Sequence, residues 1–312
     1  MTQRVLLVDG MALLFRHFYA TSLHKQFMYN SKGIPTNGIQ GFVRHIFTAI
    51  KDIKPSHVAI CWDMGQATFR NDMYTSYKQN RPAPPDELIP QFDYVKDISE
   101  QFGFVNIGVA NYEADDVIGT LAKIYSKDNE VHIVTGDRDL TQLATQNVTI
   151  YYTKKGVTDV DHYTPEFIAE KYNGLKPIQI IDMKGLMGDS SDNIPGVAGV
   201  GEKTAIKLLN QFDSVEGVYE NIDKVSGKKL KEKLELSHED ALMSKELATI
   251  NRYSPIEVTL NDTKLSDIKD NHEKIELFKK LEFKQLLADI DNKASEFEQE
   301  QKQVSFDILP TF

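Results

Sequence analysis

Five short runs of apolar and β-branched residues, separated by helical patterns, constrain the fold of this chain more than any other feature. The runs are at 5–8, 57–62, 104–109, 131–134 and 148–152. They are almost continuously apolar rather than alternating, as is typical of strands buried on both faces of a parallel sheet. Between them, residues 36–53 and 113–125 carry apolar side chains at the i, i+3, i+4 and i+7 spacing of an amphipathic helix. This alternation predicts an α/β fold, with a mainly parallel central sheet flanked by helices over roughly residues 1–160.

Acidic residues directly follow several of the predicted strands. Asp9 follows the first run, Asp63 the second, and Asp137 and Asp139 the fourth. Ligand sites in open α/β sheets lie at the carboxyl ends of the strands, so these side chains should share one edge. With the acidic residues of motif loops, the complete set is Asp9, Asp63, Glu113, Asp115, Asp116, Asp137, Asp139, Asp189 and Asp192. No histidine or cysteine joins this set, and hard oxygen donors favour Mg²⁺ or Mn²⁺ over zinc.

Nine carboxylates at one edge would repel each other and raise each other's pKa, and divalent cations would relieve that repulsion. Two such cations about 4 Å apart form the usual clamp for in-line displacement at phosphorus. Each group also has an ordinary structural interpretation. The acids at 113–116 could open a helix, those at 137–139 could cap the next helix, and those at 189–192 could be turn residues. The groups taken together, rather than any one of them, predict metal-dependent phosphate chemistry.

A glycine-rich segment at 196–205, GVAGVGEKTA, precedes the amphipathic string IKLLNQF. Two helices joined through a tight Gly-x-Gly turn form a helix-hairpin-helix, whose backbone can approach a phosphate closely. The turn glycines are Gly196, Gly199 and Gly201. Lys203 and Lys207 add positive charge at the start of the second helix. An ordinary αα-hairpin is the structural alternative. The glycine density followed by Glu-Lys-Thr favours sequence-independent binding of a DNA backbone.

The segment at 64–90 has no strand pattern and is long for a connection within a compact domain, which favours a lid or a binding loop. It combines Arg70, Lys78 and Arg81 with interleaved aromatic residues, among them Tyr77. Cations with aromatic side chains suit a single nucleic-acid strand, through phosphate pairing and base stacking. The alternative is a solvated loop with a few aromatic side chains packed beneath it.

The motifs VDG, CWD, FRN, YKQNR, YEADD, TGDRDL and MGDSSDNIPGVAGVGEKTA together resemble the 5′-nuclease superfamily of flap endonucleases and 5′→3′ exonucleases. The chain looks most like the 5′-nuclease domain of bacterial DNA polymerase I, over about residues 4–260. The resemblance implies a nuclease core at 1–180 with a helical arch at 64–90, a helix-hairpin-helix subdomain at 181–260 and a charged extension at 261–312. It implies a monomer of the bacterial cytoplasm that acts in DNA replication and repair. The implied substrates are DNA with 5′ flaps, nicks or free 5′ ends, with RNA primers as a further candidate.

The resemblance also implies roles for single residues. One metal would be held by Asp9, Asp63, Asp115 and Asp116, and the second by Glu113, Asp137, Asp139, Asp189 and Asp192. The residues expected to act in catalysis are Lys78, Arg81, Asp115 and Asp139, with Lys78 neutralising charge on a non-bridging phosphate oxygen. DNA contacts are implied for Phe15, Arg16, Arg70, Tyr77, Lys78, Arg81, Gly196, Gly199, Gly201, Lys203 and Lys207. The family further implies a potassium ion on backbone carbonyls of the hairpin.

The implied reaction is hydrolysis of a phosphodiester bond with two divalent metal ions, leaving a 5′ phosphate on the product. A non-catalytic DNA junction-binding protein is the alternative, but it needs a missing metal ligand, and no acidic position of the family pattern is missing. A phosphatase of small substrates would leave the glycine-rich segment and the basic loop unexplained. The terminal string at 303–312, QVSFDILPTF, loosely resembles peptides that bind a sliding clamp. An apolar tail packed on its own core is the alternative there.

Composition excludes several other classes of protein. Asp9 stops the N-terminal apolar run, which is too short for a signal peptide or a membrane span. The single cysteine, Cys61, excludes an intramolecular disulfide and a cysteine-based zinc site, and it fits a reducing cytoplasm. The formal net charge of −10 argues at first against a nucleic-acid partner. However, nine negative charges belong to the predicted metal site, while lysines and arginines cluster at 69–82, 203–207 and 224–233. The distribution of charge therefore agrees with DNA binding.

Overall fold

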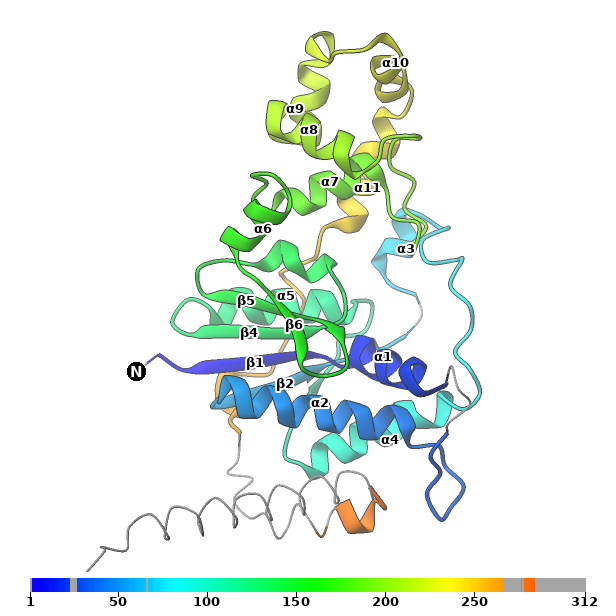
Figure 1. Ribbon diagram of the computed structural model, residues 1–312, viewed down its shortest axis with the longest axis vertical. Coiled ribbons are helices and arrows are strands. Elements are labelled where there is room, and N and C mark those ends of the chain that lie inside the picture. Colours follow the sequence, from blue (N-terminus) through cyan, green and yellow to red (C-terminus); the bar gives the residue numbers. More distant parts are fainter. Residues whose placement is uncertain (1, 23–26, 66, 266–275, 277, 284–312) are drawn as a thin grey trace, which may run out of the picture.

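The structure is a computed structural model that describes residues 2–22, 27–65, 67–265, 276 and 278–283. At its centre lies a six-stranded sheet with the strand order β3-β2-β1-β4-β5-β6 (Figure 1). The strands are β1 (Arg4–Asp9), β2 (His57–Cys61), β3 (Val105–Ile107), β4 (Glu130–Thr135), β5 (Val148–Lys155) and β6 (Asp159–Tyr163). The first five strands run parallel, which confirms the predicted mainly parallel sheet. The sequence did not predict β6, an edge strand of mostly polar residues that pairs antiparallel with β5.

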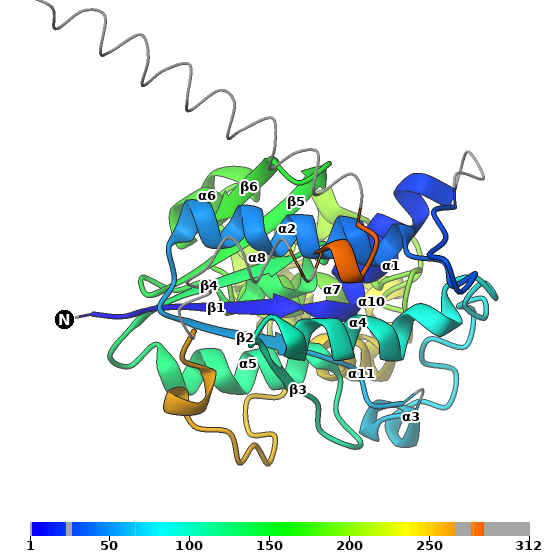
Figure 2. The same cartoon turned by 90° about the horizontal axis from the view of Figure 1, so that it is seen from below.

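Alternate residues of β1 enter two separate apolar cores, as expected for a strand that is covered on both faces. Val5 and Leu7 belong to the core that contains the side chains of α5, whereas Leu6 and Val8 belong to the core formed with α1, α2 and α4. The helices of this α/β part are α1 (Gly10–Ser22), α2 (Asn37–Ile53), α3 (Phe69–Met73), α4 (Ile89–Gln101), α5 (Ala114–Tyr125), the 3-10 turn η1 (Asp139–Leu143) and α6 (Pro165–Lys171). Figures 1 and 2 show α2 and α4 on the same side of the sheet. The helices predicted at 36–53 and 113–125 match α2 and α5 to within one residue.

A group of helices extends the α5 core away from the sheet, at the top of Figure 1. They are α7 (Gln179–Met187), α8 (Glu202–Phe212), α9 (Val215–Glu220), the 3-10 turn η2 (Ile222–Lys224), α10 (Lys228–Leu236) and α11 (His238–Ala248). After α11 the chain returns to the sheet through the 3-10 turn η3 (Leu260–Thr263), where the Leu265 amide donates to the Ser56 carbonyl at 2.9 Å. Of the charged extension predicted from residue 261, most lies outside the described residues. In the described ranges, no helix is both long enough and apolar enough to cross a bilayer.

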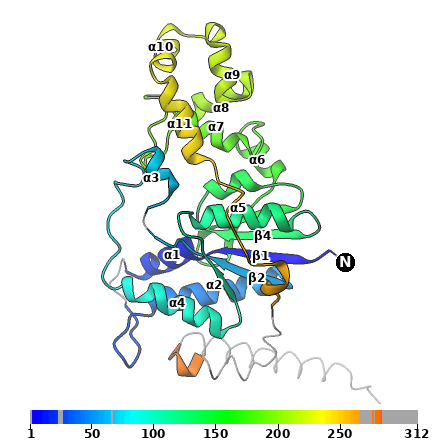
Figure 3. The same cartoon turned by 180° about the vertical axis from the view of Figure 1, so that it is seen from behind.

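The segment predicted as a helical arch, 64–90, contains less helix than its description implies. Its described residues form the single short helix α3, hydrogen-bonded turns at 75–80 and the first residues of α4. Figure 3 shows this stretch running from α3, which lies beside α11, down to α4. The segment therefore links the helical group to the far face of the sheet, and it passes the carboxyl ends of the strands on the way.

Candidate active site

The fold gathers most of the acidic residues at the carboxyl edge of the sheet. Five of them line one pocket: Glu113, Asp115, Asp137, Asp139 and Asp192. They come from the N-terminus of α5, the loop after β4 and the loop between α7 and α8. Asp63 lies just after β2, where its Oδ1 accepts a hydrogen bond from the Ala114 amide at 2.7 Å. The expected convergence of strand-end carboxylates is therefore present in this structure.

Asp9 at the end of β1 is held by two hydrogen bonds. Its Oδ1 accepts from the Ala12 amide at 3.0 Å, which also fixes the first turn of α1, and its Oδ2 accepts from Thr135 Oγ1 at 2.7 Å. Thr135, at the end of β4, was not among the predicted site residues. Its position directly before Gly136 and Asp137, in TGDRD, was the available signal.

Burial raises the pKa of several of these carboxyls. The pKa of Asp9 rises to about 7, mainly through burial and also through the nearby charges of Asp137 and Asp63, although hydrogen bonds to Ala12 and Thr135 oppose the shift. Burial, followed by repulsion from Asp9 and Asp137, raises the pKa of Asp115 well above its usual range. Burial likewise raises the pKa of Asp63. A group of carboxyls whose ionised form is disfavoured in this way is a favourable place for a divalent cation.

Two basic side chains of the 64–90 segment reach into the pocket. Lys78 Nζ lies 2.8 Å from Glu113 Oε2 and 3.9 Å from Asp192 Oδ2, and Arg81 Nη2 lies 2.5 Å from Asp192 Oδ1. The Lys78 amide also donates to the Asp192 carbonyl at 2.9 Å. Lys78 has a left-handed backbone, with φ of 54°, which is uncommon for a residue with a side chain. The segment is thus tied to the acidic loop between α7 and α8.

Arg70 and Asp116 have a different place from the one predicted. Arg70 is 2 % exposed and Asp116 is fully buried, and they form two parallel hydrogen bonds of 2.8 Å. Two further guanidinium hydrogens of Arg70 are donated to the carbonyls of Leu247 and Thr249 at the end of α11. The structure thus gives Arg70 an internal structural role, and the prediction that it contacts DNA stays untested.

The assignment of Asp116 to a metal also disagrees with the structure. Besides Arg70, its two oxygens accept from the amides of Glu113 and Asn251 at 3.0 and 2.8 Å. Both oxygens are therefore occupied in the interior, away from the pocket lining. The sequence could not separate Asp116 from Asp115, since adjacent acids in the first turn of a helix look alike until the packing is known.

Tyr77, which was predicted to contact DNA, is buried in this structure. Its side chain is 4 % exposed and packs with Ile194 and Leu247, so its ring is not available for base stacking. Its hydroxyl donates to Glu113 Oε2 at 3.2 Å and lies 3.4 Å from Asp192 Oδ2. Tyr77 therefore supports the carboxylates of the pocket from beneath.

Lys184 is a site residue that the sequence reasoning missed. From the last turn of α7 its ammonium contacts both Asp139 and Asp189, with the second contact at 2.5 Å. The pKa of Asp139 rises to about 7, mainly through burial and repulsion from Asp137, with Lys184 opposing the rise. For Asp189, burial is outweighed by Lys184 and Ser191, which lower its pKa. A charged residue within the mostly apolar string IIDMKGLM was the available signal.

The donor set of this region fits hard divalent cations, because every acidic side chain offers carboxylate oxygen and no soft ligand is present in the pocket. Within the described ranges, no three histidine, cysteine or acidic side chains stand close enough together to hold an ion as placed. Lysine and arginine instead lie between the carboxylates, with Lys184 and Lys78 each spanning two of them. The carboxylates of this region thus already surround positive charge, which is supplied by lysine and arginine side chains.

The predicted hairpin lies between α7 and α8. Gly196 and Gly199 have φ of 59° and 77°, and a Cβ on Gly196 would come within 2.1 Å of the Gly188 nitrogen, so the turn requires glycine there. Gly201 is the N-cap of α8. Lys203 and Lys207 are exposed on α8, as a contact with phosphate would require. A further cation, Lys233 of α10, lies against Gly199, where a Cβ would come within 2.3 Å of its Nζ.

The two predicted DNA contacts on α1 lie next to the acidic edge. Phe15 is half-buried, with its ring 5.8 Å from that of Phe92 of α4. Arg16 is also half-buried and lies beside Gly136, in the loop that carries Asp137. Both side chains are therefore partly accessible near the carboxylates.

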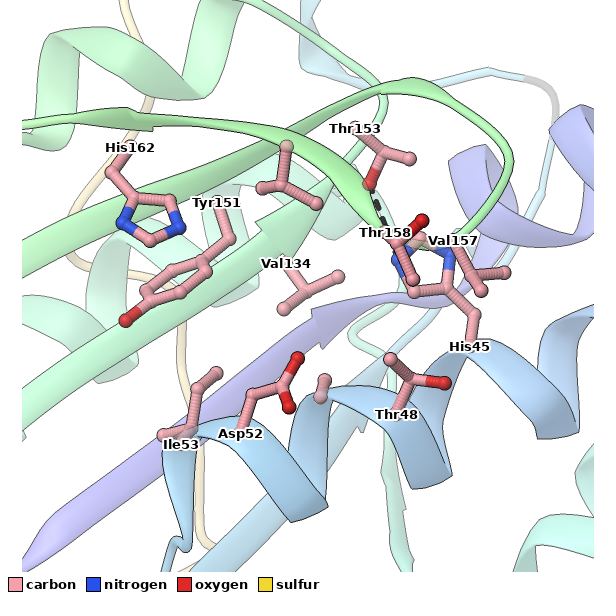
Figure 4. Close-up of a pocket in the computed structure, with 12 residues that line it drawn as sticks. His45, Thr48, Asp52, Ile53, Val134, Tyr151, Thr153, Val157, Thr158 and His162 are labelled. Atoms are coloured by element: carbon pink, nitrogen blue, oxygen red, sulfur yellow. Dashed lines mark hydrogen bonds between the residues drawn. The ribbon is translucent and has the colours of Figure 1, made fainter.

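A separate pocket lies between α2 and strands β4, β5 and β6 (Figure 4). His45, Asp52, Tyr151 and His162 are among its lining residues, and Thr153 Oγ1 lies 3.2 Å from His45 Nε2. This pocket shares no lining residue with the carboxylate pocket. It brings together none of the predicted site residues.

An α/β sheet with a carboxylate-lined pocket at its carboxyl edge, flanked by cations and a glycine hairpin, defines a protein of phosphate-ester chemistry. Comparison with known proteins makes this specific. Residues 4–173 match the model of the 5′-3′ exonuclease N-terminal resolvase-like domain, and residues 175–271 match that of the 5′-3′ exonuclease C-terminal SAM fold. The chain belongs to the 5′-3′ exonuclease family.

Individual relatives agree with this assignment. A 5′-3′ exonuclease of Bacillus subtilis (strain 168) is 48 % identical over 259 residues, which cover 83 % of this chain and 87 % of the relative. DNA polymerase I of the same organism is 50 % identical over 304 residues, covering 96 % of this chain but 34 % of the polymerase. The chain thus spans about one third of that relative. A bacteriophage T5 flap endonuclease, solved as a pseudo-enzyme-product complex with DNA and metal ions, has a TM-score of 0.64 at 27 % identity, covering 80 % of this chain and 90 % of the T5 chain.

Proposed function

We propose that this member of the 5′-3′ exonuclease family hydrolyses DNA phosphodiester bonds as a 5′→3′ exonuclease and structure-specific flap endonuclease, using two divalent cations. The observation that carries this proposal is the single pocket lined by Glu113, Asp115, Asp137, Asp139 and Asp192, with Lys78 beside them. Binding of metal ions and DNA by the similar T5 flap endonuclease supports it.

The carboxylates divide into two sets of ligands in this proposal. Asp9, Asp63 and Asp115 would hold one cation, and Glu113, Asp137, Asp139, Asp189 and Asp192 the other, some of them through water. Asp116 is left out because Arg70 and two amides use its oxygens. When bound, Mg²⁺ or Mn²⁺ would supply Lewis-acid activation of water and stabilisation of the leaving 3′ oxygen. The fit of the site to these ions is its all-carboxylate donor set.

Lys78 and Arg81 would orient the scissile phosphate. The Lys78 side chain is 24 % exposed. Its ammonium can therefore move from Glu113 to a non-bridging phosphate oxygen without a rearrangement of the residues around it. Arg81, paired with Asp192, is more exposed and would contact the neighbouring phosphate. Charge-assisted hydrogen bonds of this kind position the phosphate and neutralise charge that develops in the transition state.

The hairpin and α1 would hold the rest of the substrate. The turn glycines with Lys203 and Lys207 would bind the duplex through its phosphates, and a potassium ion on the hairpin carbonyls would add to that contact. Phe15 would stack on the base beside the scissile phosphate, with Arg16 next to it. These contacts read no base edges, so binding would depend on the structure of the DNA and not on its sequence.

We further propose a monomer that acts in the bacterial cytoplasm in replication and repair, on DNA with 5′ flaps, nicks or free 5′ ends, and on RNA primers as a further candidate. In this proposal residues 1–180 form the nuclease core and 181–260 the DNA-binding subdomain. The clamp-binding hypothesis concerns residues 303–312, which lie outside the described residues. Equal capture on an immobilised clamp after deletion of these residues would reject it.

The central test is cleavage of a 5′-flap DNA with magnesium and then with EDTA. We expect magnesium-dependent release of the flap and loss of cleavage in EDTA. Failure to cleave in magnesium would reject the proposed activity and leave the junction-binding alternative. Asp192→Ala separates the two further, because it should slow cleavage while largely keeping DNA affinity. Loss of DNA affinity would instead make Asp192 a structural residue.

The DNA-binding role of the hairpin has its own test. Lys203→Ala/Lys207→Ala should weaken binding of flap DNA and reduce the salt slope of log K by about one for each phosphate that the variant no longer neutralises. Lys51→Ala, an exposed lysine on the last turn of α2, is the matched control and should leave both unchanged. An unchanged salt slope in the double variant would remove the hairpin lysines from the interface.

A further inference from the structure

One lysine of α7 lies inside the acidic region and not at its rim. The Lys184 ammonium contacts Asp139 and Asp189, and the three side chains are only 13 %, 15 % and 17 % exposed. The two acids belong to different parts of the chain, since Asp139 begins η1 after β4 and Asp189 follows α7. Lys184 therefore bridges the α/β sheet and the helical group at the point where their carboxylates meet.

Other hydrogen bonds hold the Asp189 carboxylate and the backbone of Asp139 in place. Asp189 Oδ1 accepts from the Ser191 amide at 2.8 Å and from Ser191 Oγ at 2.6 Å, and the Asp139 amide donates to Asp137 Oδ1 at 2.9 Å. The Asp189 carboxylate is therefore preorganised, and the Lys184 ammonium supplies the positive charge between it and Asp139. Lys78 differs, because it belongs to the mostly turn-like 64–90 segment and its second contact is 3.9 Å long.

We propose that Lys184 is the built-in counter-cation of Asp139 and Asp189, and that a divalent cation binding these two carboxylates must displace its ammonium. The inference rests on the proposed function, which gives these acids to a metal. The ammonium and the metal compete for the same oxygens, so each lowers the affinity of the group for the other by the same factor. Without metal, Lys184 relieves the repulsion that a buried group of carboxylates would otherwise have.

The arrangement predicts opposite effects of one substitution on two measurements. Removing the ammonium should tighten metal binding, because nothing has to be displaced, and it should destabilise the metal-free protein, because the carboxylates lose their counter-charge. A lysine with a purely structural role would destabilise the protein without tightening metal binding. Metal affinity in the absence of DNA therefore distinguishes the two roles.

The experiment titrates Mn²⁺ into DNA-free protein and follows free Mn²⁺ by electron paramagnetic resonance. For Lys184→Met we expect binding at one site to tighten about tenfold, within the usual range for coupled sites, together with a lower Tm in EDTA. Unchanged or weaker Mn²⁺ binding would overturn the inference. If Lys184→Met fails to fold, Lys184→Gln gives the same readout with a neutral side chain that keeps hydrogen-bonding capacity.

Two further variants make the result specific. Lys245→Met is the matched control, because Lys245 also bridges two acids, Asp182 and Glu216, at 2.7 and 2.6 Å in the helical group. It should lower the Tm in EDTA and leave Mn²⁺ affinity unchanged, and a tightening equal to that of Lys184→Met would overturn the inference. Asp139→Asn tests the underlying proposal that Asp139 is a metal ligand. Unchanged Mn²⁺ binding by this variant would reject that assignment independently of the result for Lys184→Met.

Discussion

Two regions of the molecule bury titratable side chains, but one buries them as ion pairs and the other as neutral groups. At the carboxyl edge of the sheet, basic side chains are buried beside the acids as ion pairs, as in Arg70 with Asp116 and Lys184 with two acids. Between α1, α2 and β5, ring nitrogens of His17 and His45 lie 3.0 Å apart. Thr153 Oγ1 contacts the other ring nitrogen of His45 (Figure 4). Burial, with nearby positive charge, lowers the pKa of His17 to about 3 and that of His45 to about 4. Both rings are therefore neutral near pH 7.

The difference separates what folding requires from what the proposed chemistry requires. Burying an ion pair costs desolvation that its attraction often only balances, whereas a neutral hydrogen-bonded pair avoids that cost. The histidine pair satisfies its polar atoms without charge, so it is an ordinary solution for a core. The acidic edge holds charged groups at a cost in stability, as expected for a place that we propose binds cations and phosphates.

The largest effect should come from removing one charge of the acidic edge. Asp115→Asn should lower cleavage of a 5′ flap by about a thousandfold, through loss of a metal ligand. In EDTA its Tm should equal or exceed that of the wild type, because a buried repulsion disappears. Single-turnover kinetics and thermal melts measure the two effects. Asp52→Asn, at the pocket of Figure 4, should change neither activity nor its metal dependence.

A melting temperature that falls in step with activity would contradict this prediction. It would mean that Asp115, like Asp116, is needed for the fold. The charge of Asp115 would then stabilise the protein, contrary to the contrast drawn above between the acidic edge and the neutral histidine pair.

The next largest effect concerns the ion pair that we assign to structure. Arg70→Met should lower the free energy of unfolding by about 3–5 kcal/mol, because Asp116 would remain buried without its partner. Arg70→Met/Asp116→Leu should recover part of this loss, since neither charge is then left unpaired. Urea denaturation provides the measurement. A stable single variant that binds DNA weakly would restore Arg70 to the DNA interface predicted from the sequence.

Much of the fold could be predicted because buried parallel strands and amphipathic helices have strong local patterns. The β1 string VLLV and the apolar spacing of α2 determine their elements without tertiary information. The missed strand β6 reads DVDHY and pairs only at the sheet edge, so its apolar signal is weak. The sequence reasoning also missed α1, whose first turn is fixed by the Ala12 amide donating to the Asp9 carboxylate.

The site could be predicted as a group, but its members could not be sorted. Strand-end acids share an edge in any parallel sheet, which is why Asp137 and Asp139 were found, whereas Glu113, Asp115 and Asp192 were found in motif loops. Burial and partners decide the rest, and they arise from contacts between distant segments, such as Arg70 with α11 or Lys184 with η1. Neighbouring residues such as Asp115 and Asp116 therefore receive different environments from the same sequence pattern.

A smaller effect should appear as pH dependence of stability. The histidine pKa values are lower in the folded state than the ordinary 6.5, so the unfolded chain binds more protons below pH 6.5 and stability is lost as the pH falls. Between pH 7 and 5 the loss should be about 2 kcal/mol for each histidine. Asp9 and Asp139, with raised pKa values of about 7, act in the opposite sense, because their contribution grows as the pH falls.

A variant comparison isolates the histidine contribution from that of the carboxyls. His17→Gln/His45→Gln should lose less stability than the wild type between pH 7 and 5, as measured by urea denaturation without metal. Identical pH profiles for the two proteins would show that burial does not lower the pKa of the two rings, and the contrast with the acidic edge would then fail.

The smallest effect compares a single hydroxyl in each region. Thr153→Val removes the hydrogen bond with a neutral imidazole and should lower the free energy of unfolding by about 1 kcal/mol. Tyr77→Phe removes a donor to Glu113 and should lower it by about 2 kcal/mol, because hydrogen bonds to charged groups are stronger. The shapes of both side chains are nearly preserved, so the difference reports the charge of the acceptor. Equal losses at pH 7 would contradict this prediction. They would mean that Lys78 neutralises the Glu113 carboxylate so well that the hydrogen bond from Tyr77 is no stronger than one to a neutral ring. Repeating the measurement with Lys78→Met should then enlarge the Tyr77→Phe loss and leave that of Thr153→Val unchanged.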